Sequence, residues 1–481
     1  MSRAAVLGGA LAVVAVLVAC RRTPTARVIC AAGLAAATGL GIAALRAPAT
    51  AAHMLEPLAR DHPSVTAELV VTGDPQVTQS RSARGRFLGA LVLVPASVRR
   101  LRVDNRDVRL RAAVLVLAHG DRWRTLLPSQ RLTAIGILLP ARSGDTVAFA
   151  LSARGPPATV GPPSLVQRVA GRLRAGLRAA AYPLPGDERG LLPGLVDGDV
   201  SALPDRVRAE FRVTGLTHLV AVSGANVAIV AAAAFALARG LRLGLRGRAV
   251  LATAAIVGFV VLARPSPSVL RAAVMGSLGL AALATGRLRA GVPALAAAVL
   301  LLVLAEPALA TADGFVLSVL ATGGLLLVAP RLRDRFLPHM PRWAAESLAV
   351  AVAAQLMTAP YIAVRFARVS MLSVPANLLA APAVPPATVL GVVAATVAPV
   401  CVPLARAVAA LAYLPTAWLA GVARIGAGVP GASISWPRGV PGLLLLAAAG
   451  LVVVGIRWRR RVRRWPSGPA DRHGAAHADR R

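Results

Sequence analysis

The feature that most constrains this chain is a series of apolar runs, each long enough to cross the hydrocarbon layer of a membrane. Two runs lie near residues 4–20 and 28–45, and others recur from about 216 to the C-terminal region. A spanning helix needs about 20 apolar residues, because the hydrocarbon core is about 30 Å thick. Only 15% of the 481 residues are charged, against about a quarter in soluble proteins. The sequence therefore excludes an ordinary soluble enzyme.

The second block of runs predicts a helical membrane region. Its helices are expected at about 216–238, 249–263, 269–286, 293–306, 314–330, 343–363, 374–399, 404–425 and 441–456. With the first two runs, these make about eleven crossings. Pro382, Pro385 and Pro386 interrupt the run at 374–399, which could equally be a broken or re-entrant segment.

The short arginine-rich loops predict the orientation in the membrane. If every run crosses once, the loops at 21–27 and 239–248 and the tail from Arg457 fall on one side. Short loops rich in arginine stay in the cytoplasm. We therefore expect a multi-pass protein of the cytoplasmic membrane, with the N-terminus outside and the C-terminus in the cytoplasm.

Residues 60–160 have a different pattern, because no run there is long enough to span. Short segments such as 67–71 and 108–114 alternate apolar and polar residues, and Gly, Pro, Asp and Asn separate them. Alternation with a period of two indicates strands with one buried face. These residues predict a small antiparallel β-domain of about five strands outside the membrane.

The segment 164–181, which follows the β-domain, predicts an amphipathic helix. Four arginines lie on one arc of this helix and four apolar side chains on the opposite arc, namely Arg168, Arg172, Arg174 and Arg178 against Val166, Val169, Leu173 and Leu177. Such a helix anchors at a membrane surface, or guides an anion to it.

The expected fold is thus an all-α polytopic membrane protein with an inserted extracytoplasmic β-domain. Its expected parts are two N-terminal transmembrane helices at 1–45, the β-domain at 46–163, the amphipathic interfacial helix and linker at 164–213, a helical membrane domain at 214–456 and a basic cytoplasmic tail at 457–481.

Arginine supplies all the basic charge, since the 54 basic residues include no lysine, and the formal net charge is +34. Within 60–160, fifteen Arg stand against seven Asp and Glu. Aromatic residues are few there, so binding to a polyanion would be mainly electrostatic and salt-dependent. The alternative is an arginine-rich surface that reflects composition alone. The candidate external basic surface consists of Arg84, Arg86, Arg99, Arg100, Arg102, Arg109 and Arg111.

Polar side chains within the helical block are candidates to line a channel, because an ionisable group at membrane depth costs several kcal/mol unless it is paired or faces water. The densest segment is 211–227, where a helix starting at Leu216 would place His218, Ser223 and Asn226 on one stripe. Helix packing through small and polar residues is the alternative. The candidates are Arg212, His218, Ser223, Asn226, Arg271, Asp313, Gln355 and Asn377.

Four of these candidates each have two possible roles. Arg271 could reach the interface or line a path for phosphates. Asp313 could be a first-turn carboxylate favoured by the helix dipole, or could pair with Arg271 or another buried arginine. Gln355 and Asn377 are expected to form hydrogen bonds across helices, and lining a channel would be an additional role.

The segment 211–227 resembles the central signature of the ComEC-type competence permeases, multi-pass proteins implicated in passing single-stranded DNA across the cytoplasmic membrane. The resemblance extends in order along the chain. It covers Leu195–Asp199 with Leu203, Pro204 and Phe211, then 267–275, then Glu306, Pro307 and 313–318, and finally 355–360 through 377–382. It implies an OB-fold-like external domain, and a channel for single-stranded DNA during natural competence.

The sequence departs from the family pattern in two places. Asn226 stands where many members have His, and an amide cannot titrate. The family's metallo-β-lactamase-like domain, its proposed nuclease, has no counterpart, because the seven histidines are scattered and form no HxHxDH-type cluster. We therefore expect no enzyme activity, no metal and no cofactor.

These observations leave several partners and alternatives open. A separate metallo-β-lactamase-like nuclease, a DNA receptor, a cytoplasmic motor and a second copy of the chain are the possible partners, beside single-stranded DNA and membrane lipids. The alternative functions are transport of another anion, such as a lipid-linked or exported solute, and a non-functional remnant. Cys20 ends a stretch that resembles a lipoprotein cleavage site, but Arg21 and Arg22 favour a cytoplasmic loop.

Overall fold

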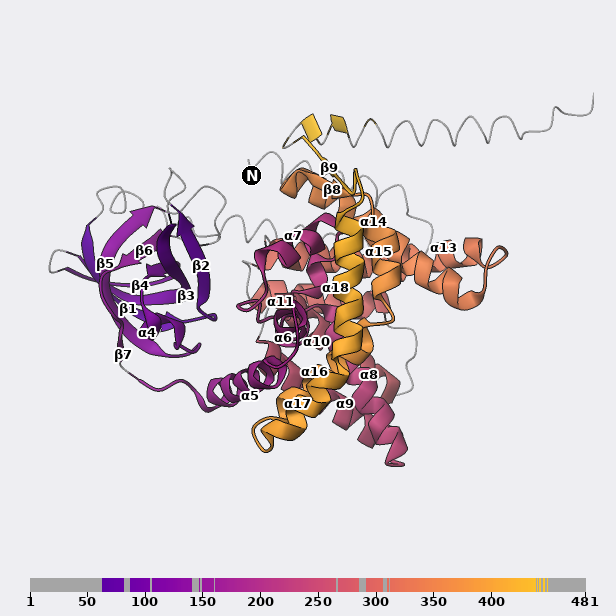
Figure 1. Ribbon diagram of the computed structural model, residues 1–481, viewed down its shortest axis with the longest axis horizontal. Helices are drawn as coiled ribbons and strands as arrows, with labels where there is room; N and C mark the ends of the chain where they lie inside the picture. Colours follow the sequence, from indigo (N-terminus) through magenta and orange to yellow (C-terminus); the bar gives the residue numbers. More distant parts are fainter. Residues whose placement is uncertain are drawn as a thin grey trace, which may run out of the picture.

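The computed structural model describes residues 63–81, 87–103, 106–140, 149–159, 161–264, 267–284, 291–305 and 312–437, with a few single positions between and beyond them. Figure 1 shows a β-domain joined through α5 to a helical body. The expected helices at 1–45, most of the run at 441–456, the tail at 457–481, Arg84 and Arg86 lie outside the described residues, as does the side chain of Arg111.

The β-domain contains more strands than the five expected. They are β1 (Ser64–Val71), β2 (Gln76–Arg81), β3 (Phe87–Val103), β4 (Arg106–Ala118), β5 (Arg131–Pro140), β6 (Phe149–Ala153) and β7 (Ala158–Thr159). The predicted alternation is visible in β1, where Val65, Ala67, Leu69 and Val71 are buried. The additional strands are short: β2 has six residues and β7 has two.

Five of these strands close into a ring. The order is β1-β3-β4-β6-β5, and β5 pairs back with β1. The pairing of β4 with β6 is parallel, while the other pairs are antiparallel, which corrects the expectation of a purely antiparallel sheet. Strand β2 pairs with β3, and β7 with β5.

A short helix contributes one large side chain to the core of this ring. Helix α4 (Asp121–Arg124) lies between β4 and β5, and its Trp123 is fully buried. The indole N–H of Trp123 donates to the carbonyl of Gly155 at 3.1 Å, so its polar atom is satisfied. Phe149, Leu101 and Leu151 complete the core around it.

The helical body begins with α5, at the position where the sequence predicts the amphipathic helix. Its elements are α5 (Leu165–Ala181), α6 (Glu188–Asp197), α7 (Asp205–Val213), the 3-10 turn η1 (Thr217–Leu219), α8 (Gly224–Gly240), α9 (Leu245–Ala263), α10 (Pro267–Ala284), α11 (Gly291–Ala305), α12 (Asp313–Leu327), α13 (Ala329–Phe336), α14 (Arg342–Phe366), α15 (Ser373–Ala380), α16 (Val384–Val397), α17 (Val402–Leu411) and α18 (Tyr413–Ala427). A ribbon of β8 (Arg368–Ser370) and β9 (Ser433–Ser435) lies at one end (Figure 1).

Fewer continuous spans occur than the apolar runs predict. In the described part of the chain, only α9 and α14 are long and apolar enough to cross a membrane alone. Three pairs meet the same test together but are bent: α12 with α13 by 43°, α15 with α16 by 53°, and α17 with α18 by 45°. These pairs raise the number of candidate spans to at most five among the described residues, so the eleven crossings are not confirmed.

Proline accounts for the bends. Pro330, Pro385 and Pro415 each lie within the first three residues of the second helix of a bent pair. Proline lacks an amide hydrogen and its ring clashes with the carbonyl four residues earlier, so a helix does not continue straight through it. The broken form of the run at 374–399 is the alternative that the sequence left open.

The first helix of the predicted permease region starts later than expected. Gly215 has φ 76°, Thr217–Leu219 form a single 3-10 turn, and Ser223 has extended backbone. Helix α8 therefore begins at Gly224 rather than at Leu216, and the predicted stripe of His218, Ser223 and Asn226 on one helix is wrong. The positive φ at Gly215, which glycine adopts at low cost, is the local reason.

Candidate functional site

The first group of candidate residues ties the start of α8 to α6. The Ser223 hydroxyl donates to Oδ1 of Asn226 at 3.0 Å, and Nδ2 of Asn226 donates to the Leu195 carbonyl at 2.6 Å. Asn226 is buried. An amide with both ends bonded in this way holds the non-helical chain before α8 against the end of α6.

The second group is centred on Arg271, in the first turns of α10. Only 5% of Arg271 is exposed. Its Nε donates to the Ser318 hydroxyl of α12 at 3.0 Å, Nη2 donates to the same oxygen, and Nη1 contacts Sδ of Met275 at 3.0 Å. No carboxylate among the described residues forms an ion pair with Arg271, so its charge is met there by neutral acceptors.

The first two groups are neighbours because Gly224 has no side chain. A Cβ atom on Gly224 would lie 3.0 Å from Nη2 of Arg271 and 3.1 Å from Cβ of Ala272. This close approach lets the start of α8 lie directly against the guanidinium. The Ser223 and Asn226 pair therefore flanks the buried arginine.

Asp313 bonds to two residues of α14 and not to Arg271. Its Oδ1 accepts from the Tyr361 hydroxyl at 2.7 Å and from Nε of Arg365 at 3.0 Å, both on α14. The proposed pair with Arg271 does not form. Asp313 lies in the first turn of α12, where the helix dipole favours a carboxylate.

The third group joins Gln355 to Asn377 through a residue that the sequence analysis missed. The Ser373 hydroxyl donates to Oε1 of Gln355 at 2.8 Å, and Nδ2 of Asn377 donates to the Ser373 carbonyl at 2.7 Å. Gly215 packs on Ser373, since a Cβ there would lie 2.9 Å from Oγ. The spacing of Ser373 and Asn377, four residues apart on a helix, is the signal that could have found this serine.

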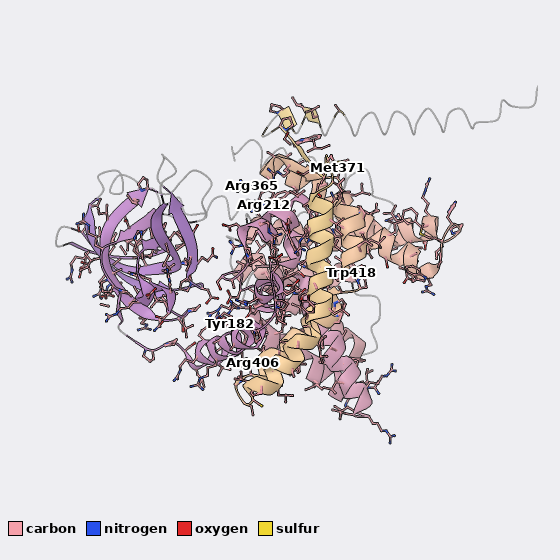
Figure 2. The ribbon with its side chains drawn as sticks, in the orientation of Figure 1. Tyr182, Arg212, Arg365, Met371, Arg406 and Trp418 are labelled. Carbon is pink, nitrogen blue, oxygen red and sulfur yellow. The ribbon has the colours of Figure 1, made fainter. Side chains whose placement is uncertain are left out.

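Arg212 and His218 are exposed and belong to none of these groups. Arg212 lies in the last turn of α7 and His218 in η1. Figure 2 shows Arg212 at the end of the helical body that also carries Arg365 and Met371, away from Arg406.

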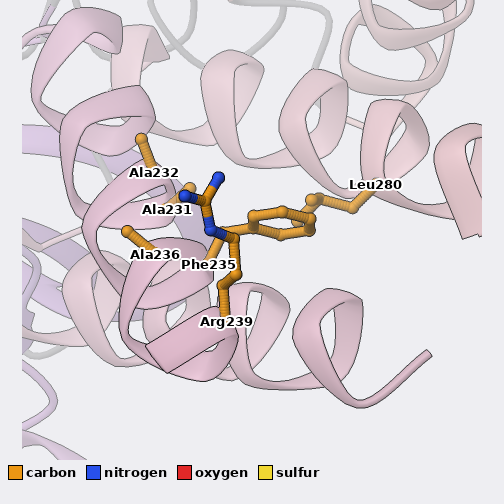
Figure 3. Close-up of a pocket in the computed structure, with 6 residues that line it drawn as sticks. All are labelled: Ala231, Ala232, Phe235, Ala236, Arg239 and Leu280. Atoms are coloured by element: carbon orange, nitrogen blue, oxygen red, sulfur yellow. The ribbon is translucent and has the colours of Figure 1, made fainter. Parts of the chain in front are cut away.

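None of the candidate residues lines the pocket that the structure describes. They form three hydrogen-bonded groups, with Asp313, Arg212 and His218 apart from them. A pocket of about 310 Å³ lies elsewhere, between α8 and α10 (Figure 3). No group of three His, Cys, Asp or Glu side chains that could hold a metal occurs among the described residues.

The candidate basic surface of the β-domain is partly neutralised by acidic neighbours. Arg100 pairs with Glu68 at 3.4 Å, and Arg102 with Asp107 at 2.8 Å. Arg99 and Arg109 are exposed, and within the described chain neither has a carboxylate partner in ion-pair range. Arg100 and Arg102 are thus paired with carboxylates, whereas the charges of Arg99 and Arg109 remain available to an anion.

A buried charge cluster at the base of the β-domain also escaped the sequence analysis. Arg174 of α5, 5% exposed, and Arg264 after α9 both bind Asp74, in the turn between β1 and β2, at 3.1 and 2.7 Å. Arg174 also donates to the Asp197 carbonyl at 2.5 Å. The amphipathic pattern placed Arg174 on the basic arc of the helix, because the pattern carries no information about a partner a hundred residues away.

Comparison with known proteins places these groups in a family context. Residues 195–461, more than half of the chain, match the Competence family, described as competence protein. ComE operon protein 3 of Bacillus subtilis (strain 168) is 30% identical over 200 residues, which is 41% of this chain and 25% of that protein. The aligned region thus spans a quarter of that relative's length. No solved structure matches the chain. With apolar candidate spans in the matched region, this chain is a membrane protein that belongs to the competence protein family, of the ComEC type.

Proposed function

We propose that this chain passes single-stranded DNA across the cytoplasmic membrane during natural competence. The family match and the candidate spans support a membrane role in competence. The proposal assigns the chemistry of DNA cleavage and the driving force to separate partners, namely a nuclease, a DNA receptor and a cytoplasmic motor, and assigns no catalytic step to the described residues.

The observation that carries this proposal is the buried cation at Arg271. A guanidinium that is removed from water without a carboxylate partner costs several kcal/mol. Its Nη2 lies beside Gly224 and its other contacts are the Ser318 hydroxyl and the Met275 sulfur. A phosphate would accept two parallel hydrogen bonds from the guanidinium fork, and would thereby offset that cost.

The neutral side chains around Arg271 favour passage of a phosphate over its retention. Ser223, Asn226 and Ser318 can each exchange a hydrogen bond with a phosphate oxygen without adding charge. A second fixed cation would hold each phosphate more tightly, whereas hydroxyl and amide groups release it. In this proposal, the three hydrogen-bonded groups, of which the first two are neighbours, constitute the closed state of the route.

The proposal gives the β-domain an OB-like fold that gathers DNA outside the membrane. The five-stranded ring, its parallel β4–β6 pair and the short helix between β4 and β5 support this assignment. OB-folds bind oligonucleotides through their strands and loops. Arg99 and Arg109, on the hairpin of β3 and β4, are the cations that it would present to the phosphates.

Uptake of labelled DNA tests this proposal. Deletion of the gene should abolish entry of labelled DNA, and the wild-type chain should restore it. Arg271→Ala should not restore entry although the protein reaches the membrane, and Arg271→Lys should restore it only in part because it lacks the planar fork. Arg406→Ala, at an exposed arginine of α17, is the control and should behave as wild type.

The outcomes separate the alternatives. If deletion leaves transformation unchanged, the chain transports another anion or is a non-functional remnant. If deletion abolishes entry but Arg271→Ala restores it fully, the chain is needed for uptake and Arg271 is not on the route.

A further inference from the structure

The pocket between α8 and α10 has a distinctive lining. Five of its residues come from α8 and one from α10, namely Ala231, Ala232, Phe235, Ala236 and Arg239 with Leu280. Its volume of about 310 Å³ is many times the roughly 30 Å³ that one water molecule occupies in the liquid. In Figure 3 the Phe235 ring extends toward Leu280, and the Arg239 guanidinium extends toward Ala231 and Ala232.

The run of alanines explains why this space is open. Residues 231–234 and 236 are all alanine, so that apart from Phe235 this stretch of α8 carries almost no side-chain volume. The lining is therefore apolar apart from a single cation at one end. A site that is polar throughout would suit an ion or a nucleotide, whereas this one suits a hydrocarbon chain that ends in an anion.

The charge around the pocket is of one sign. From residue 227 to 263 the sequence contains no Asp or Glu, and Arg239, Arg242, Arg246 and Arg248 fall within ten residues. Arg239 is exposed, and no ion pair or hydrogen bond of its side chain is found among the described residues. Its guanidinium is therefore available to an anion from outside the chain.

Apolar side chains accompany these arginines at the tip of the α8–α9 hairpin. Leu237 is 60% exposed, Leu241 61% and Leu245 44%, which is unfavourable in water but not in contact with acyl chains. Arginines close to exposed leucines are typical of a segment at the level of lipid headgroups. The short arginine-rich turn also belongs on the cytoplasmic side, where anionic lipids attract basic segments.

We infer that this pocket is a binding site for an anionic phospholipid, with an acyl chain along Ala232, Ala236 and Phe235 and the phosphate at Arg239. This site lies apart from the groups assigned to DNA and does not depend on that assignment. A free phosphate would gain nothing from the apolar lining, and a neutral phospholipid would gain less from Arg239. Basic pockets between membrane helices bind anionic headgroups in this manner.

Lipid retention by the purified full-length protein tests the inference. The protein is reconstituted with equal amounts of phosphatidylglycerol and phosphatidylcholine, extracted in mild detergent, and the bound lipids are counted by native mass spectrometry. Wild type should retain phosphatidylglycerol preferentially. Arg239→Gln should weaken its retention about fivefold, since one arginine near an anionic lipid contributes about that factor. Glycerol phosphate added in excess should not displace the lipid.

Two further variants sharpen this test. Arg246→Gln removes an exposed arginine of the same turn that does not line the pocket, and it should retain the lipid as wild type does. Ala236→Phe fills the groove and should reduce retention while leaving every charge in place. If Ala236→Phe does not fold, the two arginine variants and the comparison of the two lipids still test whether the pocket binds an anionic phospholipid.

Three results would overturn the inference. Equal retention of the two phospholipids would mean that Arg239 recognises no phosphate. Unchanged retention in Arg239→Gln would have the same meaning, and an equal loss in Arg246→Gln would assign the effect to the general charge of the turn.

Discussion

Arg174 of α5 binds Asp74 of the β-domain, with 3.1 Å between Nη2 and Oδ2, and so links the two parts of the molecule. The same guanidinium donates to the carbonyls of Asp197 and Leu262, at the ends of α6 and α9. One side chain thus contacts the β-domain and two helices of the body. Arg264, which has a φ of 64° that is unusual for a residue with a side chain, binds the other oxygen of Asp74.

Asp74→Asn should loosen the β-domain from the helical body. It removes the charge that two largely buried guanidinium groups share, and we expect a loss of about 2 kcal/mol because Asp74 itself is a third exposed. Hydrogen exchange at the amides of α5 and of the turn between β1 and β2 should become faster. Asp121→Asn, at a carboxylate whose side chain is 89% exposed, is the control and should leave exchange there unchanged. Equal protection in both variants would mean that other contacts dock the domain.

Asp197 should make stability depend on pH. Burial raises the pKa of its carboxyl to about 6, above the unfolded value of about 3.8, and Oδ2 has no hydrogen-bond partner among the described residues. The folded state therefore holds the proton more tightly, and this contribution to stability is lost as pH rises through 6. Between pH 5 and pH 8 wild type should lose about 1.4 kcal/mol relative to Asp197→Asn.

Thermal unfolding of both proteins at a series of pH values between 5 and 8 measures this difference. Asp197→Asn keeps an oxygen that can accept from the amide of Asp199, which Oδ1 does in wild type at 2.9 Å. Parallel curves for the two proteins would show that the carboxyl titrates as it does in the unfolded chain.

Gly323 and Gly324 offer a matched pair on α12. A Cβ on Gly324 would lie 2.8 Å from the Ala353 carbonyl oxygen and 2.8 Å from Cγ of Met357, whereas a Cβ on Gly323 would meet nothing within 4 Å. Gly324→Ala should therefore separate α12 from α14 and cost about 1–3 kcal/mol. Gly323→Ala should stabilise by up to about 1 kcal/mol through helix propensity. Unfolding temperatures in detergent give both values, and similar shifts for the two variants would refute the close packing.

The β-domain should bind single strands mainly through Arg99 and Arg109, in keeping with the proposed function. Replacing both with alanine in the full chain should reduce the slope of log K against log salt by about 1.4, since each contact to a single strand contributes about 0.7. The double variant of Arg100 and Arg102, which are paired with Glu68 and Asp107, should reduce the slope less. Fluorescence anisotropy of a labelled oligonucleotide at several salt concentrations measures each slope. An equal reduction in the two double variants would mean that the ion pairs do not withhold those charges.

Local patterns predicted much of the secondary structure. The alternation in β1 and the 3.6-residue pattern in α5 depend on neighbours along the chain, so the sequence alone indicates them. Ring closure by β1 and β5 depends on pairing between residues such as Ser64 and Ile137, and no local pattern encodes that contact. Pro415 can be read from the sequence, but hydropathy does not reveal the bend there, because the run around this proline stays apolar.

In the candidate site too, single residues could be predicted from the sequence, whereas their distant partners could not. Arg271 could be singled out because a charge among apolar residues is conspicuous by itself. Its acceptor Ser318 is 47 residues away, and Ser373 is 18 residues from Gln355, so these partners emerge only when helices pack. The first-turn position of Asp313 could be read from the sequence, whereas its partner Arg365, 52 residues away, could not.

The closed ring of the β-domain determines which chemical groups a partner can contact. Within the described residues, β1, β3, β4, β5 and β6 have neighbours on both sides over part of their length, so the main-chain amides and carbonyls of those stretches are already engaged. A polymer that meets these doubly paired stretches contacts side-chain tips, guanidinium groups among them, rather than a free strand edge. Guanidinium tips distinguish charge and spacing but not the identity of a base. If the β-domain binds single strands in this way, the geometry of the barrel makes its affinity independent of nucleotide sequence.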